Sequence, residues 1–89
     1  MKIIRFDSKI DKDIIRCADR QLDIEIFNNA VDMLEAGGPI PRSYHPHPLK
    51  GKYLGFHSLT LAHDWRLLYF KKGDVIHIAR TGSHSDLGY

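Results

Sequence analysis

A segment rich in proline and glycine divides this 89-residue chain and limits what it can fold into. Residues 37–52 contain all four prolines and three of the seven glycines. Because proline lacks a backbone N–H and clashes with the preceding helical turn, this segment cannot form a regular helix. We therefore expect a stiff linker between two parts of one domain, residues 1–89, which has room for a single modest core.

The part before the linker predicts a short strand and two helices. Residues 2–6 have the pattern of a strand, and Asp7 and Ser8 are both good N-cap residues. Ser8 and Asp11 resemble a capping box, in which the N-cap and third-residue side chains bond each other's backbone N–H. Apolar residues at helical spacing then predict a first helix of about three turns and a second over residues 23–36. These apolar residues are Ile10, Ile14, Cys17 and Ala18, then Ile24, Phe27, Ala30, Val31 and Leu34.

The part after the linker predicts three consecutive strands. Leu59 and Leu61 face one way along the first, while Ser58 and Thr60 face the other. Residues 65–72 form the second strand, and Gly73-Asp74 turns the chain into the third, which ends at Gly82. Short connections make the three strands an antiparallel meander. The predicted fold is α+β, in the order β-α-α-β-β-β, with a helical hairpin packed on a twisted antiparallel sheet.

Composition narrows the class of protein. The chain is 43% hydrophobic and 27% charged, as in an ordinary soluble globular protein. Its single cysteine, Cys17, excludes an intrachain disulfide and argues against a cysteine-based metal site. The first residues contain no apolar run long enough for a signal peptide or a membrane span, so we expect a cytoplasmic protein with no membrane partner. We find no cofactor motif and expect no cofactor.

Charge is distributed unevenly along the chain. Residues 1–40 hold six Lys/Arg and eight Asp/Glu, whereas residues 41–89 hold seven Lys/Arg and three Asp. All six histidines also lie in the second half. This asymmetry favours an anionic partner for one face of the molecule, with nucleic acid as the leading candidate and a solvated basic surface as the alternative.

Three polar segments can meet if the meander forms: the linker with His47, the turn with His63 and Asp64, and the end of the last strand with His84. Cleavage of RNA without a metal needs a base for the 2′-hydroxyl and an acid for the leaving 5′-oxygen, and histidine can fill either role near neutral pH. It also needs fixed positive charge at the developing anion, which arginine and lysine supply. An aromatic side chain can hold a base by stacking.

Each of these residues also has a simpler explanation. His84 could lie in a frayed C-terminus, and Trp65 could be a core residue. His45 and His47 could be a metal pair, but they lack nearby cysteine or glutamate ligands, so we predict no metal site. Lys50 and Lys52 could be solvated loop charges. His57 and His77, which lie within strand patterns, are expected to have structural or surface roles.

Taken together, three motifs resemble the YafQ branch of the RelE/ParE toxin superfamily. They are His47-Pro-Leu-Lys-Gly-Lys-Tyr, His63-Asp-Trp-Arg-Leu-Leu-Tyr and Arg80-Thr-Gly-Ser-His-Ser-Asp-Leu, and the resemblance covers essentially the whole chain. It implies the toxin of a type II toxin–antitoxin module. Such a toxin enters the ribosomal A site and cleaves mRNA there without a metal. It also implies a cognate antitoxin similar to DinJ or RelB, through which alone the toxin reaches operator DNA.

The resemblance also implies roles for individual residues. His84 matches the main catalytic histidine, expected to be the general acid, and His47 matches the loop histidine. Asp64 matches an acidic residue that helps in proton transfer, and Arg80 matches the arginine that supports the scissile phosphate. RNA binding falls to the remaining basic and aromatic residues of the motifs, Lys50, Lys52, Trp65 and Arg66.

The sequence departs from the family pattern at two positions. Thr60 stands where the family has a histidine, and a hydroxyl cannot be a general base at neutral pH, so His63 is the better substitute. The expected aromatic after the tail histidine falls on Gly88, with Tyr89 one residue later. The alternative function is a ParE-like inhibitor of a protein target such as DNA gyrase, or a weak toxin that acts mainly through antitoxin binding and repression.

Overall fold

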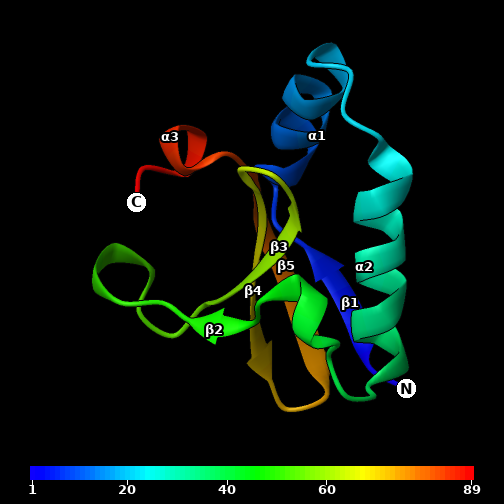
Figure 1. Ribbon diagram of the computed structural model, residues 1–89. Coiled ribbons are helices and arrows are strands. Elements are labelled where there is room, and N and C mark those ends of the chain that lie inside the picture. Colours follow the sequence, from blue (N-terminus) through cyan, green and yellow to red (C-terminus); the bar gives the residue numbers. More distant parts are fainter.

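The computed structural model describes residues 1–89 and contains one five-stranded sheet with two long helices beside it (Figure 1). The strands are β1 (Ile3–Phe6), β2 (His47–Pro48), β3 (His57–Ala62), β4 (Trp65–Lys72) and β5 (Val75–Gly82). The α-helices are α1 (Ile10–Asp19), α2 (Ile24–Ala36) and α3 (His84–Leu87), and short 3-10 helices cover Arg42–Tyr44 and Gly51–Tyr53. The predicted α+β class is confirmed. None of the helices is long and apolar enough to span a membrane.

The sheet has the order β1-β5-β4-β3-β2. β3, β4 and β5 form the predicted antiparallel meander. β1, however, pairs with β5 in parallel, with Ile3 opposite Val75, so the sheet is mixed and not wholly antiparallel. Parallel pairing requires a long connection between the two strands, and here nearly the whole chain provides it.

The two long helices begin differently. The Asp23 carboxylate caps α2 by accepting the backbone N–H of Glu25, and Gly37 ends this helix with φ 78°. The predicted capping box between Ser8 and Asp11 does not form, because α1 begins one residue later with Lys9 as its N-cap. Asp7 instead accepts the backbone N–H of Lys9, which satisfies one donor just before the helix.

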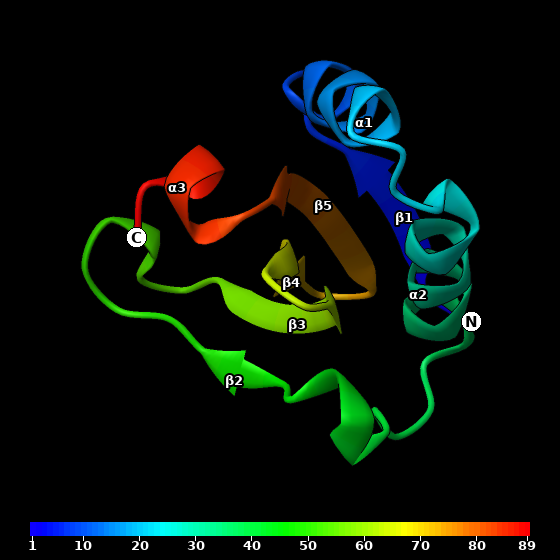
Figure 2. The same ribbon diagram turned by 45° about the horizontal axis from the view of Figure 1, so that its top comes forward.

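Each face of the sheet carries its own hydrophobic cluster. The larger cluster lies between the sheet and helices α1 and α2; its sheet residues are Leu59, Trp65, Leu67, Tyr69, Ile76 and Ile78. We call the opposite side of the sheet the open face; the smaller cluster there consists of Leu49, Tyr53, Leu68 and Leu87. Figure 2 shows α3 and the loop before β3 together, on the side of the molecule away from α2. The prediction that Leu59 and Leu61 share one face of the strand is confirmed, and that face packs on the larger cluster.

Two elements of the structure were not predicted. The linker contributes the two-residue strand β2, which pairs with β3 so that His47 lies opposite Ser58. The polar tail after Gly82 forms the helical turn α3, and its N-cap Ser83 makes a complete capping box with Asp86. These two elements bring the linker and the C-terminus to the open face.

Candidate active site

The C-terminal turn is anchored, not frayed. Asp86 receives hydrogen bonds from the guanidinium of Arg20, the C-cap of α1, one of them 2.9 Å long, and from the backbone N–H of Ser83 at 2.9 Å. The bonds from Arg20, and to a smaller extent those from Ser83, hold the pKa of the Asp86 carboxyl well below its usual range. On the other side, the buried Tyr53 hydroxyl donates to the Leu87 carbonyl at 2.7 Å. Arg20 at the end of α1 and Tyr53 of the second 3-10 helix therefore fix the position of the turn that carries His84.

His84 pairs with Asp64, the aspartate of the turn between β3 and β4. The carboxylate oxygen Oδ1 of Asp64 accepts the His84 backbone N–H at 3.1 Å and lies 3.0 Å from Nδ1 of its ring. These contacts, the backbone one most of all, lower the pKa of Asp64. Both side chains are about half exposed, at 46% for His84 and 50% for Asp64. Because Asp64 contacts Nδ1, the other ring nitrogen, Nε2, remains available to a ligand.

Tyr89 completes one side of this site. Its ring centroid lies 4.9 Å from that of His84, and its hydroxyl lies 3.4 Å from Oγ of the buried Ser58. A β-carbon at position 88 would come within 2.9 Å of the Lys52 amine, and φ at Gly88 is +75°. The family's aromatic would therefore be strained at position 88, whereas Tyr89 can reach the site.

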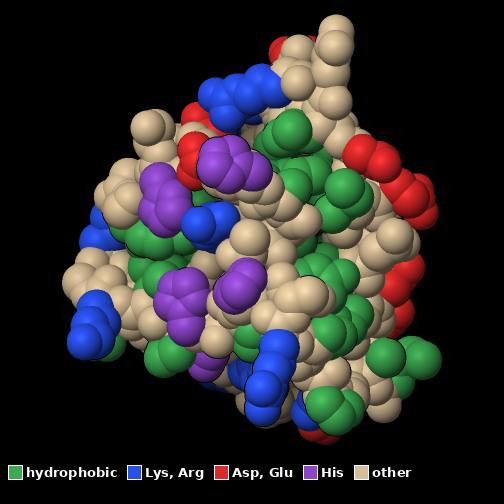
Figure 3. All heavy atoms as spheres, viewed as in Figure 1, with side chains coloured by type: hydrophobic (Ala, Val, Ile, Leu, Met, Phe, Trp, Pro, Cys, Tyr) green, Lys and Arg blue, Asp and Glu red, His purple; other side chains and the backbone are tan.

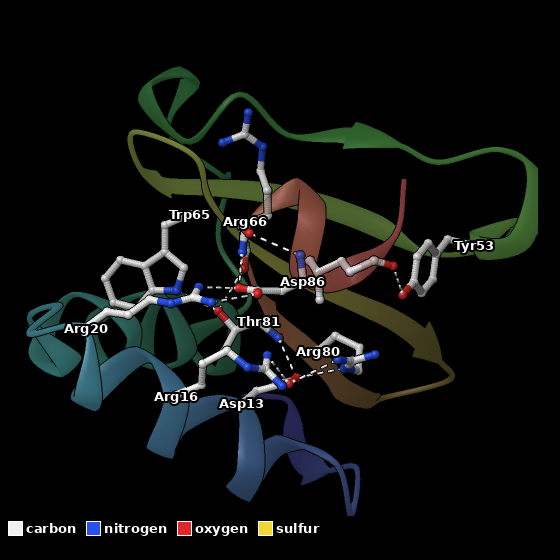
Figure 4. A network of polar contacts seen from close by, with 11 residues as sticks. Asp13, Arg16, Arg20, Tyr53, Trp65, Arg66, Arg80, Thr81 and Asp86 are labelled. Atoms are coloured by element: carbon white, nitrogen blue, oxygen red, sulfur yellow. Dashed lines mark hydrogen bonds and ion pairs between the residues drawn. The ribbon is translucent and has the colours of Figure 1, made fainter.

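Arg66 is a cation of the open face that forms no ion pair. In the sheet register it lies between Thr60 of β3 and Gly82 of β5. Its Nη1 atom is buried and has no hydrogen-bond partner. Figure 4 shows its guanidinium pointing away from the neighbouring polar network. The positive charge of Arg66, two residues after Asp64 in the sequence, also contributes to the lowered pKa of that carboxyl.

His47 lies on β2, opposite Ser58 in the register. Its Nδ1 is 2.9 Å from the His45 carbonyl oxygen. A carbonyl can only accept, so this nitrogen carries the proton, and in the neutral ring Nε2 is then an acceptor. The exposed side chain of His47 can therefore offer a lone pair to a substrate.

Arg80 was expected to support the scissile phosphate, but its guanidinium is already bonded to a carboxylate of the protein. Its Nε lies 2.7 Å from Oδ2 of Asp13, and its Nη2 lies 3.1 Å from Oδ1 (Figure 4). Asp13 is 1% exposed and also accepts the Thr81 backbone N–H and a bond from Arg16. This pairing raises the pKa of Arg80 and compensates its charge. No hydrogen bond connects Arg80 with His84.

Trp65 belongs to the core. It is 1% exposed, and its ring N–H donates to the Thr81 hydroxyl at 2.9 Å (Figure 4). The prediction that Trp65 binds RNA is therefore wrong, because a buried ring has no face for a base. Its packing instead fixes the start of β4, directly after Asp64.

The remaining predicted residues lie around the site. Lys50 is exposed, and the amine of Lys52 lies 5.2 Å from the centroid of the Tyr53 ring. His63 is exposed in the turn beside Asp64, and Thr60 lies opposite Arg66. Figure 3 shows histidines gathered around a Lys or Arg side chain on one face, while acidic side chains lie along the α2 side. No group of three or more His, Cys, Asp or Glu side chains is arranged to hold a metal ion.

Sequence reasoning missed the residues that anchor the site: Asp13, Arg20, Ser58 and Asp86. One signal was present for Asp13. It lies in the apolar stripe of α1, between Ile10 and Cys17, where a carboxylate needs a buried partner. Nothing in the sequence identifies that partner, 67 residues away.

Comparisons with known proteins give one consistent result. The family model described as "Bacterial toxin of type II toxin-antitoxin system, YafQ" matches residues 2–89. The mRNA interferase toxin YafQ of Escherichia coli is 27% identical over 94% of this chain and 92% of its own length. A crystal structure of YafQ from E. coli has a TM-score of 0.91 at 24% identity, covering 98% of each chain. The toxin in the E. coli DinJ-YafQ toxin-antitoxin complex has a TM-score of 0.87 at 26% identity, covering 97% of this chain and 96% of its own.

Proposed function

The chain belongs to the YafQ family of bacterial toxins of type II toxin–antitoxin systems, and on this basis we propose that it cleaves messenger RNA on the ribosome without a metal ion. The similar E. coli protein is named an mRNA interferase. The observation that carries the proposal for this chain is the pair of His84 and Asp64. It presents one ring nitrogen of a half-exposed histidine on the open face, beside an unpaired arginine.

In the proposed reaction the 2′-oxygen of the RNA attacks the adjacent phosphorus and the bond to the 5′-oxygen breaks. The products are a 2′,3′-cyclic phosphate and a free 5′-hydroxyl. His84, protonated and oriented by Asp64, gives the proton on Nε2 to the leaving 5′-oxygen. His47 takes the proton of the 2′-hydroxyl on Nε2, because its Nδ1 is bonded to a carbonyl.

Arg66 supplies the positive charge that the crowded phosphorane requires. Its buried Nη1 has no protein partner, so an anion that binds there satisfies a group that otherwise carries a desolvation cost. Thr60, opposite Arg66, can add one hydrogen bond, and Tyr89 can contact the substrate beside His84. His63 is a second candidate for the base, on the turn that carries Asp64.

We propose that the partners of the chain are a cognate antitoxin, the ribosome and mRNA, that it acts in the cytoplasm, and that it reaches operator DNA only through the antitoxin. The similar E. coli toxin forms a complex with DinJ. A cavity of about 280 Å³ at the end of α2 supports an antitoxin contact here. Its apolar residues include Leu34 and Ile40, and Lys2 and Lys71 flank them. An amphipathic acidic segment that folds on binding fits this combination.

Expression of the protein alone in bacteria, with mapping of mRNA ends, tests the proposal. The wild type is expected to stop translation and to leave cleaved mRNA. His84→Ala should cut the cleavage rate by roughly 10²-fold or more, the usual scale for losing a proton-transfer group. The matched control is His57→Gln, which changes a histidine on the helix side of the sheet, where its ring stacks on Tyr69.

Two results would contradict the proposal. DNA damage without mRNA cleavage would support inhibition of a target such as DNA gyrase. Full toxicity of a His84→Ala variant that is expressed at the wild-type level would exclude His84 as the acid. Circular dichroism of each purified variant separates loss of chemistry from loss of fold.

A further inference from the structure

A basic recess lies on the open face, apart from His84. It is a cavity of about 240 Å³ between the start of α1, the middle of β5 and the loop before β3. Its lining includes Lys9, Lys52 and Arg80, with Tyr53 and Phe56 as the aromatic residues. None of the residues proposed to transfer protons lines it.

Tyr53 connects this cavity with the site of His84. Its ring lines the cavity, and its centroid lies 5.7 Å from that of Tyr89, which is 4.9 Å from the His84 ring. A nucleic-acid strand that crosses the open face from His84 therefore reaches the cavity after passing two rings, those of Tyr89 and Tyr53. The cavity and the site of His84 are close enough to serve neighbouring units of one extended ligand.

The charges in the cavity favour an anion. The amines of Lys9 and Lys52 form no ion pair. Arg80 also lines the cavity and is held by Asp13, so it is already oriented before any ligand binds. One carboxylate, that of Asp7, also lines the cavity and accepts the backbone N–H of Lys9. Asp13 compensates the charge of Arg80. The two lysines still outnumber the single carboxylate of Asp7, so the cavity remains positive.

The aromatic part of the cavity favours a nucleotide over a free anion. Phe56 is partly exposed, and it meets Tyr53 and Phe70 edge to face, with centroid distances of 5.7 and 5.0 Å. Proteins that bind single-stranded nucleic acid combine cations for the phosphates with aromatic rings for the bases. An acidic protein segment would match the cations but would make no special use of a ring beside them.

We propose that this cavity binds a nucleotide that flanks the cleaved bond, with its phosphate between Lys9, Lys52 and Arg80 and its base against Phe56. The inference rests on the proposed function, because it assumes that the ligand is single-stranded RNA. It gives Arg80 a role at a flanking phosphate, while the reacting phosphate lies near Arg66.

The test compares Lys9→Gln with Lys12→Gln, which removes the same charge from an exposed position of the same helix outside the cavity. On ribosomes programmed with mRNA, Lys9→Gln should raise KM roughly tenfold and leave kcat unchanged, because it removes a charged contact used in binding. For Lys9→Gln, the slope of log affinity for the programmed ribosome against log salt concentration should be smaller in magnitude than for the wild type by about 0.7, the value for one phosphate of a single strand. Lys12→Gln should match the wild type.

A second measurement uses a 2′-O-methyl hexanucleotide, which cannot be cleaved. Its binding to the wild type, followed by amide NMR, should shift the signals of Ala79 and Arg80. Phe56→Leu, which preserves an apolar side chain, should weaken that binding roughly tenfold, the scale of one stacked base. This titration does not depend on cleavage, so a protein that binds the oligonucleotide here but cuts no mRNA retains the cavity assignment and loses the proposed enzymatic function.

Three outcomes overturn the inference. Equal KM values for Lys9→Gln and Lys12→Gln would place Lys9 outside the RNA path. Saturation of the cavity by inorganic phosphate as tightly as by the oligonucleotide would make it a site for free anions. Weaker binding of the antitoxin to Lys9→Gln, with RNA binding unchanged, would assign the cavity to the protein partner.

Discussion

Two aspartates of this protein make the same kind of contact in two different environments. Asp13 and Asp64 each accept a backbone N–H from the C-terminal part of the chain and a bond from a basic side chain of the same part. Asp13 is 1% exposed and its partner is an arginine, which stays charged, whereas Asp64 is half exposed and its partner is a histidine. The first contact can only hold elements together, but the second can also exchange a proton with a ligand.

Burial explains why the two contacts differ in the number of bonds. A carboxylate removed from water is stable only when its oxygens are fully satisfied. Asp13 accordingly receives bonds from Arg16, Arg80 and Thr81, at 2.7 to 3.1 Å. Asp64 needs only His84, because water can reach the rest of its carboxylate. The exposed pair is therefore free to change its charge, and the buried one is not.

The largest expected effect comes from breaking the buried contact. Asp13→Ala should lower the free energy of unfolding by about 3–5 kcal/mol, because it leaves the Arg80 guanidinium and the Thr81 N–H without a partner. Urea denaturation followed by circular dichroism measures this change, with Asp11→Ala on the exposed side of the same helix as the control. A loss below about 1 kcal/mol would show that Asp13 does not anchor α1 to β5.

The exposed contact should affect activity far more than stability. Asp64→Asn is expected to lower kcat for mRNA cleavage by roughly 10²-fold with little change in KM, because a neutral amide no longer supports the imidazolium of His84. Asp64→Glu, which keeps the charge, should restore part of the rate. If Asp64→Asn raised KM at unchanged kcat, Asp64 would act in binding and would not orient His84.

The smallest expected effect sharpens the comparison with a third aspartate, Asp86, which lies between the two in burial. Its lowered pKa means that the stability it contributes is present above the unfolded-state pKa of about 3.9 and is lost as pH falls toward the folded value. Arg20 is the main cause, so Arg20→Gln should be less stable than the wild type at pH 6 and approach it near pH 2. Denaturation midpoints across that range measure the convergence, and parallel curves would contradict it. Lys12→Gln controls for the lost positive charge.

Much of the fold follows from local patterns in the sequence. Apolar spacing predicted α1 and α2, the turn residues predicted the meander, and the alternation in β3 placed Thr60 on the face opposite Leu59. The parallel pairing of β1 with β5 was not predictable in this way, because it depends on contacts between the two ends of the chain. A four-residue helix such as α3 is too short to show a period, although Ser83 and Asp86 are typical of a capping box.

The site was predictable in its chemistry and not in all of its contacts. His84 and Asp64 were expected to act together, and the structure places them 3.0 Å apart. Arg80 and Trp65 were expected at the RNA. The pattern of a strand cannot show that Arg80 pairs with Asp13, or that the Trp65 ring bonds Thr81. In both cases the missing information was a partner distant in sequence or on another strand.

The long separation of these partners has a consequence for how the molecule folds. The pairs Ile3–Val75, Asp13–Arg80 and Arg20–Asp86 each close a loop over most of the chain. Contacts of such high order form late, since the entropy of loop closure is spent before they yield any stabilisation. We therefore expect slow, cooperative folding for a domain of this size, with β1 and α1 docking onto a preformed meander. Until that step is complete His84 has no fixed position, so a partly folded chain would carry the side chains proposed for catalysis without the arrangement that cleavage requires.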